Sequence, residues 1–420
     1  MKNKILIFAR CVLMSTLILS TASSASARGD DTYRTGFIRW RAADGEFSSW
    51  TRNGVSLPSE GELTFDLATA SAGTDPYPAG GYYGGNYYNS GNFFVGEATS
   101  PVISTSLINY TEAIASWNAS TPAGTWIEAQ FRAQYGGTRW SKWYVLGIWS
   151  SDTSTLQRHS VRLQGDSDGF VAVDTFVSTN KKETTNKFQL KFLLFSEDGT
   201  ATPTVRNASV AYSTSPPKKA AVTSTGNPAL WNTLVDIPEC SQMVYPDGGE
   251  VWCSPTSTSM VLGQWMNGGE DAASCEDRVR DAVSGVYDWI YDGHGNWPFN
   301  TAYAATKTIG TTKLEGYVAR FTSLAKAEEY VAMGVPVVMS IAWGNGDLTG
   351  SDIASTNGHL LVLVGFDAAG DPIVNDPASP ANETVQRTYL REEFEALWLE
   401  ASGGTVYLIY PEGMSVPALP

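Results

Sequence analysis

The strictest constraint on the fold of this chain is a run of alternating polarity in its first half. From Trp126 to Tyr135, apolar side chains at every second position alternate with Glu, Gln and Arg. A period of two places the two sets on opposite faces of a β-strand, so that one face packs against a core. Residues 188–195 repeat the pattern, and further strands are predicted at 143–149, 171–177 and 205–212.

Short strands separated by glycine-containing turns, with no helical period between them, are typical of β-sandwiches. We therefore predict an all-β, jelly-roll-like sandwich over residues 28–214, a candidate binding module. Within it, segment 73–91 is rich in glycine and tyrosine. Its rings are suited to stacking on sugars or peptides, or else they pack onto the sandwich. His159, in a polar run of the same domain, is expected at the surface.

The second half of the chain has a different pattern. A stiff, polar segment with two adjacent prolines predicts a linker at residues 215–230. Helical signals follow, after Pro255 and after the expected caps Ser274 and Ser323. Helices that precede strands predict an α+β domain over residues 231–420. Its buried strands are expected at 335–341, 359–366, 372–375 and 405–410.

The first 27 residues have the features of a secretory signal peptide. Lys2, Lys4 and Arg10 accompany a short apolar core, and residues 25–27 form a small-residue cleavage site. We expect a secreted protein; the alternative is a membrane anchor, which the short apolar core disfavours. No later segment is apolar over enough residues to predict a transmembrane helix.

Charge and composition exclude some classes of partner. The chain has 28 Lys and Arg against 43 Asp and Glu, a formal net charge of −15 at pH 7. Such a protein is repelled by phosphate backbones, so nucleic acid is not an expected partner. Its glycines lack the strand and helix context of a nucleotide fingerprint, and its His and Cys lack metal-ligand spacing, so no cofactor and no metal are predicted.

Cys253 is the candidate nucleophile. It lies where a loop is predicted to become a helix at Pro255, and the free amides of a helix N-terminus stabilise a thiolate. Cys240, Cys253 and Cys275 follow the signal peptide, and an odd number leaves one thiol unpaired outside the cytoplasm. The count alone leaves open whether Cys253 is free or bridged.

A thiol nucleophile needs a base and a group that orients it. His359 opens an apolar strand in the same domain, where one side of its ring can stay open to a cleft. Asp376 ends the next strand, which a short turn should place antiparallel to the first. Asn375 is the rival, and because side chains alternate along a strand, only one of the two can face His359.

Other residues complete the candidate site. Gln242, shortly before Cys253, is the candidate side-chain donor of an oxyanion hole. His294 and Trp297 lie in a glycine-containing segment that can line a substrate cleft, and Trp252 directly precedes the nucleophile. We expect these three residues to bind substrate.

The order of these motifs resembles a known family. Gln242, then Cys-Ser-Pro-Thr-Ser from 253, then Asn-Gly-His with its apolar strand from 357, then Val-Asn-Asp-Pro from 374 is similar to the papain-like cysteine peptidases of family 39, in their secreted bacterial branch. Founding members of that family cut bacteriocin leaders after a double glycine. The resemblance covers about residues 231–412. It implies Cys253 as nucleophile, His359 as base, Asp376 as orienting acid and Gln242 as oxyanion donor, and it favours a Cys240–Cys275 disulfide.

Two functions from different classes fit the sequence. The first is a secreted cysteine peptidase or amidase that hydrolyses a peptide or protein substrate, with cell-wall peptide as an alternative substrate. The second is a non-catalytic secreted protein that binds peptides or cell surfaces on a papain-like scaffold. A binding module has no need of all four residues of the candidate site, so the first is favoured.

Overall fold

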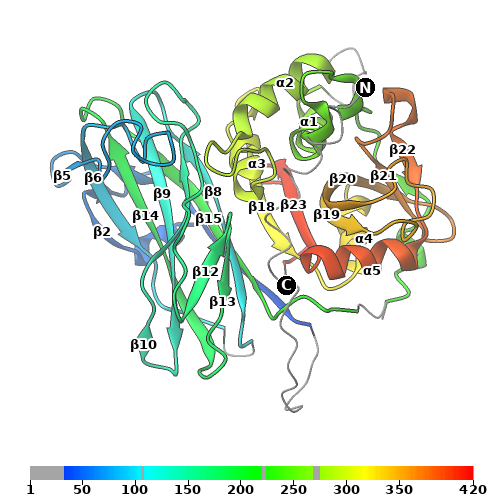
Figure 1. Cartoon of the computed structure of the whole chain (residues 1–420), viewed down its shortest axis with the longest axis horizontal. Helices are drawn as coiled ribbons and strands as arrows, with labels where there is room; N and C mark the ends of the chain where they lie inside the picture. Colours follow the sequence, from blue (N-terminus) through cyan, green and yellow to red (C-terminus); the bar gives the residue numbers. More distant parts are fainter. Residues whose placement is uncertain (1–32, 106–107, 220–223, 268–274, 420) are drawn as a thin grey trace.

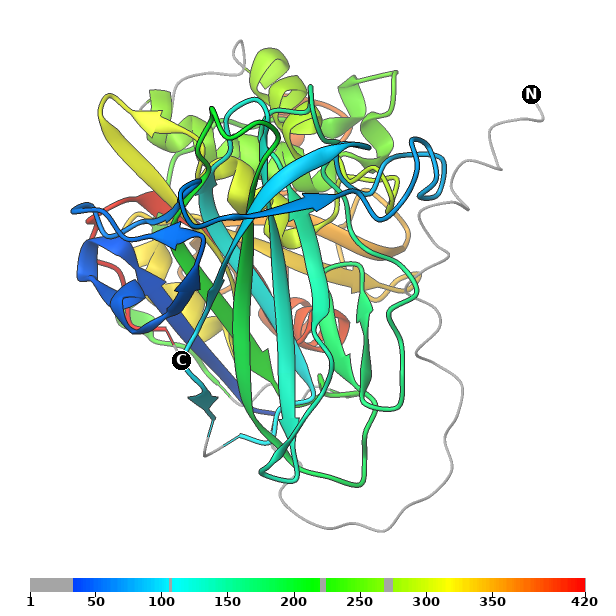
Figure 2. The ribbon, with the colours of Figure 1, turned by 90° about the vertical axis from the view of Figure 1, so that its left-hand side faces the viewer.

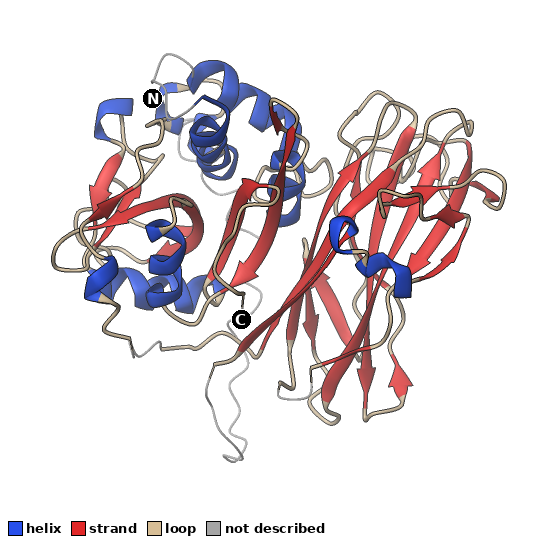
Figure 3. Cartoon of the chain, turned by 180° about the vertical axis from the view of Figure 1, so that it is seen from behind, coloured by secondary structure: helices blue, strands red, loops and turns tan. Residues whose placement is uncertain are grey.

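The computed structural model describes residues 33–105, 108–219, 224–267 and 275–419. The predicted signal peptide at residues 1–27 and the expected cap Ser274 lie outside these ranges. The chain forms a β-sandwich and an α+β half that lie side by side (Figure 1). The α-helices of the described chain all lie in its second half, and the helices of the first half are short 3-10 helices (Figure 3).

The sandwich consists of two antiparallel sheets, with one sheet turned outward and the other facing the α+β half (Figure 2). The sheet that faces the α+β half has the strand order β12 (Gly169–Ala172), β13 (Thr175–Ser178), β8 (Glu112–Ser120), β15 (Thr204–Ser213), β4 (Leu63–Phe65) and β3 (Val55–Ser56), with β1 (Thr35–Arg41) also on β15. The outer sheet has the order β10 (Arg139–Trp140), β9 (Thr125–Tyr135), β14 (Thr185–Ser196), β6 (Asn92–Thr99) and β2 (Thr51–Asn53), with β11 (Tyr144–Trp149) on β9, β5 (Ser71–Thr74) on β6 and β7 (Ile103–Ser104) on β14.

The alternating run that predicted the sandwich is strand β9. Its apolar positions, such as Phe131 and Tyr135, are fully buried between the sheets. The opposite face is only partly in water, because Tyr88 of the tyrosine-rich segment covers Glu128 and donates a hydrogen bond to it at 2.6 Å. Several tyrosines of that segment therefore pack onto the outer sheet, although Tyr77 and Tyr83 stay exposed.

Two expectations for the sandwich were wrong. Residues 171–177 are not one strand: β12 and β13 form a hairpin whose turn holds Val173 at φ +60°. His159 is buried, and its two ring nitrogens contact the carbonyl oxygens of Ser160 and Tyr87, each at 2.9 Å. The polar residues next to His159 in sequence gave no sign of this burial, because the segment around Tyr87 that covers it is more than seventy residues away.

The α+β half is built on a third antiparallel sheet. Helices α1 (Cys253–Asn267), α2 (Cys275–Val286) and α3 (Trp297–Ala304) gather on one side of it, and α4 (Leu324–Ala332) and α5 (Arg391–Ser402) on the other (Figure 1). The strand order is β17 (Thr308–Ile309), β18 (Thr312–Arg320), β23 (Thr405–Pro411), β19 (Val337–Trp343), β20 (Thr356–Phe366), β21 (Pro372–Asn375) and β22 (Gln386–Thr388), with β16 (Thr233–Leu234) on β20. Helices α3 and α5 and strand β18 were not predicted from the sequence.

The two halves share a tightly bonded interface rather than a loose junction. Along the outer edge of β18, Asn118 of β8 donates to the Gly316 carbonyl at 2.8 Å and accepts from the Gly316 amide at 3.3 Å. Ser116 accepts from the amide of Val318 at 3.1 Å. These side chains satisfy backbone groups that an unpaired strand edge leaves open. The sandwich thus caps the edge of the third sheet, and the hydrophobic core runs on through both halves.

Candidate active site

Cys253 is the first residue of α1, two residues earlier than Pro255, where the sequence predicted the helix to start. The carbonyl of Trp252 accepts the first helical hydrogen bond, from Thr256 at 3.0 Å. The Cys253 amide belongs to the first turn, whose amides have no partner within the helix and give the N-terminus a partial positive charge. The half-buried Cys253 therefore lies at the positive end of α1.

The other two cysteines form a disulfide. Cys240 and Cys275 are bonded, with their Cα atoms 5.7 Å apart, and Cys253 is the free cysteine of the described residues. This pairing, favoured by the family resemblance, is confirmed. The bond ties the segment before α1 to the start of α2, so it stabilises the framework around the nucleophile and leaves its thiol available.

His359 and Asp376 lie together in the interior. The Nε2 atom of His359, on β20, is 2.7 Å from Oδ1 of Asp376, which directly follows β21. Strands β20 and β21 are antiparallel neighbours, as the sequence predicted. Because Nε2 is occupied by the carboxylate, the Nδ1 side of the ring is left for the Cys253 thiol, which is hydrogen-bonded to the imidazole.

The electrostatics of the pair favour a cationic imidazole. Burial disfavours the charged ring, but the Asp376 carboxylate and the hydrogen bonds to Asp376 and Cys253 outweigh it and raise the pKa of His359 to about 10. For Asp376, burial opposes the charged form, and the attraction of His359 and the hydrogen bonds it accepts hold its pKa below the usual value. At neutral pH the site therefore holds an imidazolium between the Asp376 carboxylate and the sulfur of Cys253.

Asn375 lies on the opposite face of the strand from Asp376. Its side-chain amide points to the carbonyl of Pro238 at 3.5 Å, and its own side-chain oxygen is buried without a hydrogen-bond partner among the described residues. Of the two rivals, Asp376 is the one that contacts the imidazole. The alternation of side chains along the strand accounts for this outcome.

Two further residues of the site gave no signal in the sequence. Tyr389 donates from its hydroxyl to Oδ2 of Asp376 at 2.7 Å, and the Ala378 amide donates to Oδ1 at 2.9 Å, so the carboxylate is held on both oxygens. The indole of Trp343, at the end of β19, lies edge-on to the imidazole of His359 with ring centroids 5.6 Å apart. Tyr389 precedes a helix that was not predicted, and Trp343 lies two residues beyond the end of its predicted strand.

Gln242 belongs to the segment that precedes α1, and it contacts the segment that follows Asp376. It begins a short 3-10 helix, Gln242–Val244, and its backbone amide donates to the Pro377 carbonyl at 2.8 Å. Its own carbonyl packs closely against Gly249, where a Cβ atom would approach to 2.0 Å. Gln242 is buried, and its side-chain oxygen has no hydrogen-bond partner among the described residues.

The three predicted substrate-binding residues are only partly brought together. The ring centroids of Trp252 and His294 are 6.1 Å apart. The ring of Tyr287 lies against both His294 and Trp289, with centroids 5.0 Å apart in each pair. Burial lowers the pKa of His294 to about 4, so it is neutral at pH 7. Trp297 instead opens α3 at the interface, where its amide donates to Asp174 of the sandwich at 2.7 Å.

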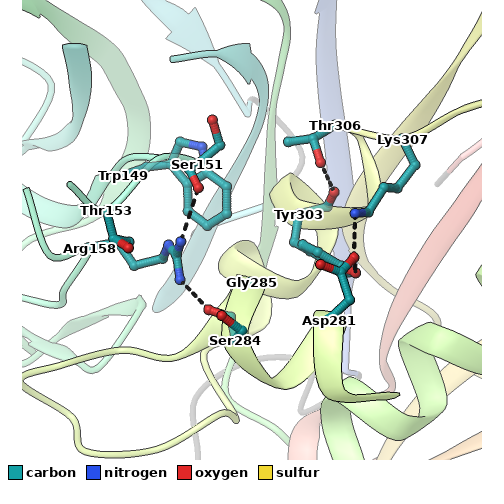
Figure 4. Close-up of a pocket in the computed structure, with 10 residues that line it drawn as sticks. All are labelled: Trp149, Ser151, Thr153, Arg158, Asp281, Ser284, Gly285, Tyr303, Thr306 and Lys307. Carbon is teal, nitrogen blue, oxygen red and sulfur yellow. Dashed lines mark hydrogen bonds and ion pairs between the residues drawn. The ribbon is translucent and has the colours of Figure 1, made fainter. Parts of the chain in front are cut away.

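A polar cavity of about 180 Å³ lies between the two halves (Figure 4), and neither Cys253 nor His359 is among the residues that line it. Arg158 of the sandwich lines one side and donates to the carbonyls of Ser284 and Ser151, at 2.9 and 3.3 Å. On the other side, Lys307 pairs with Asp281 at 2.6 Å. The charged side chains of Arg158 and Lys307 are thus already bound by other groups of the chain. The cavity is part of the contact surface between the two halves.

Within the described residues, no cluster of three or more His, Cys, Asp or Glu side chains could hold a metal ion. None of the described helices is both long and apolar enough to cross a membrane. A free cysteine at a helix start beside a histidine–carboxylate pair is the arrangement of groups that papain-like thiol hydrolases use.

Comparison with known proteins identifies the family. Residues 234–406 match the Peptidase_C39-like family, and residues 37–213 match the peptidase C39 N-terminal domain. The chain belongs to the peptidase C39-like family and carries a peptidase C39 N-terminal domain before the peptidase-like domain. No curated protein matches the chain.

Likenesses to solved structures are weak and partial. One is to a structure described as carbohydrate-binding modules of the β-sandwich superfamily, with 11% identity, a TM-score of 0.18, and coverage of 41% of this chain and 54% of that one. Another is to the CBM22-1–GH10 modules of Clostridium thermocellum xylanase 10B with xylohexaose, with 10% identity, a TM-score of 0.18, and coverage of 45% and 30%. This chain thus spans about half, and about a third, of the length of those chains.

Proposed function

We propose that this protein is a secreted cysteine peptidase in which Cys253, His359 and Asp376 form the catalytic triad. The observation that carries the proposal is the imidazole of His359, bound to Asp376 at 2.7 Å on one side and to the thiol of Cys253 on the other. Membership of a peptidase family supports a peptide or protein as substrate. Cell-wall peptide is one candidate within that class.

In the first half of the reaction, the thiolate of Cys253 attacks the carbonyl carbon and a tetrahedral oxyanion forms. The Cys253 amide and the side-chain amide of Gln242 are the proposed donors to that oxyanion, and such donors typically contribute several kcal/mol. The imidazolium of His359 gives its proton to the leaving nitrogen, the C–N bond breaks, and an acyl-thioester remains on the sulfur.

In the second half, water attacks the thioester. His359, now neutral, takes a proton from the water, the C–S bond breaks, and the carboxylic acid product leaves. Asp376, held by Tyr389 and the Ala378 amide, orients the ring through both steps. Aromatic residues beside the nucleophile, Trp252 and His294, are the proposed contacts for substrate side chains.

Secretion is part of the proposal. The first 27 residues have the sequence of a signal peptide, and the Cys240–Cys275 disulfide is a bond that persists in oxidising compartments. N-terminal sequencing of the protein from the culture medium tests this point; we expect a mature start near residue 28.

The test of catalysis uses the purified mature protein, a quenched-fluorescent peptide library and cell-wall peptide. We expect hydrolysis that is blocked by iodoacetamide and abolished in Cys253→Ala. Ser254→Ala, next in the chain and bonded to Tyr407 at 2.9 Å rather than to the triad, is the matched control and should stay active. Hydrolysis that persists in Cys253→Ala would contradict the proposal and favour a non-catalytic binding role for this domain.

A further inference from the structure

One loop from each half of the molecule borders a second cavity, of about 300 Å³. The sandwich contributes residues 83–86 of the glycine- and tyrosine-rich segment together with Gln157. The α+β half contributes Trp289, from the segment between α2 and α3. Cavities of this size at the junction of two domains are where small ligands most often bind.

Two aromatic rings of the cavity are left in water. Tyr83 keeps 52% of its surface exposed and Trp289 keeps 46%, whereas most large aromatic residues in the described chain are buried. Exposed apolar surface costs about 25 cal/mol per Å² relative to burial. Exposed rings that line a concavity mark a surface prepared for a ligand that covers them.

The loop that carries Tyr83 is held rigidly. Its backbone adopts φ +52°, a left-handed conformation that costs a non-glycine residue about 1 kcal/mol or more. Reciprocal backbone hydrogen bonds between Tyr82 and Gly85, at 3.0 and 2.9 Å, close the turn around it. The guanidinium of Arg162 lies 5.4 Å from the Tyr83 ring and donates to the Ile290 carbonyl of the other half. The ring is therefore fixed before any ligand arrives.

The polar side chains of the cavity are two amides, Asn86 and Gln157, and the imidazole of His159, whose ring nitrogens already contact backbone carbonyls. Gln157 is exposed, and its side-chain amide has no hydrogen-bond partner among the described residues. Asn86 accepts from the Gly80 amide through its side-chain oxygen, at 2.8 Å, which leaves its NH₂ group as a donor. Among the described residues that line the cavity, none is a carboxylate, a lysine or an arginine.

This combination selects a chemical class. A sugar ring presents an apolar face of C–H groups that stacks on aromatic rings, and its edge of hydroxyl groups both donates to and accepts from amides. An anionic or cationic ligand would need a counter-charge, which the lining lacks. We propose that the cavity between Tyr83 and Trp289 is a binding site for a neutral sugar ring of an oligosaccharide.

The cavity is lined in part by Trp289, which belongs to the same half of the molecule as the candidate triad. Trp289 connects through Tyr287 and His294 to Trp252, beside Cys253, in a series of ring contacts of 5.0 to 6.1 Å. Sugar binding itself needs no chemistry at Cys253, so the two proposals can fail separately.

The test is isothermal titration calorimetry of the mature protein with four neutral probes: chitohexaose, cellohexaose, xylohexaose and maltohexaose. We expect at least one to bind, and Trp289→Ala, Tyr83→Ala and Gln157→Ala each to weaken that binding by about tenfold or more, as for central anchor residues. Circular dichroism melting curves confirm that each variant is folded.

Tyr77→Ala is the matched control, because Tyr77 belongs to the same segment and is exposed to 41% but does not line the cavity. It should bind like the wild type, and Cys253→Ala should do so whether or not the protein proves to be a peptidase. Absence of binding by all four probes, or equal affinity in wild type and Trp289→Ala, overturns the proposal.

Discussion

Replacing Asp376 by asparagine removes one charge from the candidate site and keeps the shape of the side chain. The difference between an ordinary imidazole pKa of 6.5 and about 10 in the folded protein corresponds to roughly 5 kcal/mol in favour of the cationic ring. The Asp376 carboxylate is the largest contribution in that direction, and burial opposes it. In Asp376→Asn burial should prevail, lower the pKa of His359 below 6.5, and leave the ring neutral at pH 7.

The assay is the rate of Cys253 alkylation by iodoacetamide as a function of pH. An ordinary thiol, with a pKa of about 8.5, is less than about 1% ionised at pH 6. A cationic His359 beside the sulfur stabilises the negative charge of the attacking group, so at pH 6 the wild-type protein should be alkylated faster than Asp376→Asn. In Asp376→Asn the rate at pH 6 should fall by about 100-fold and recover toward pH 9, while peptide hydrolysis falls by about 10²- to 10⁴-fold.

Asn375→Ala is the control, because Asn375 is adjacent in sequence but directed away from the imidazole toward Pro238. It should keep the wild-type alkylation profile. Cys253→Ser measures background labelling at other thiols. Identical pH profiles of alkylation in wild type and Asp376→Asn would refute the reasoning. If the profile shifted only in Asn375→Ala, Asn375 rather than Asp376 would be the residue that acts on His359.

Three further predictions concern neighbouring groups. Tyr389→Phe removes a hydrogen bond to a charged carboxylate and should lower the free energy of unfolding by about 1.5–3 kcal/mol, measured by urea denaturation at pH 7. Gln242→Ala should lower kcat by about 10²-fold while the alkylation rate of Cys253 stays unchanged, since an oxyanion donor acts only in the transition state. Burial raises the pKa of Asp174 to about 7, so the native state keeps a proton that the unfolded state loses near pH 4. Stability should therefore fall as pH rises from about 4 to 7, by up to roughly 4 kcal/mol, and Asp174→Asn should remove this decline in denaturation curves recorded across that range.

The features predicted from sequence are those encoded by local pattern. The alternating run of β9 identified a sandwich strand, because burial on one face imposes a period of two wherever the strand pairs. The neighbouring strands β20 and β21 were predicted because a short turn joins them, and the same turn brings Asp376 to His359. These inferences need only residues that are close in the chain.

The features missed depend on contacts between distant segments. Helix α3 begins in a segment of glycine and asparagine with a proline at its second position, and it is stabilised by the cap Asn296 and by Asp174 from the other half. The pairing of Asn118 with Gly316 joins residues 198 positions apart, and Tyr389 gives no sign in the sequence that its hydroxyl reaches Asp376. Such contacts leave no periodic pattern in a single sequence.

The contacts around α3 also bear on the role of the sandwich. Asp174 accepts from the Trp297 amide at 2.7 Å and so fixes the start of α3 from the other half. Further along α3, Asn300 donates to the His294 carbonyl at 2.9 Å and accepts from Thr258 of α1 at 3.2 Å. Because α1 begins at Cys253, the sandwich is joined through α3 to the helix of the nucleophile. The sandwich is therefore part of the framework of the candidate active site.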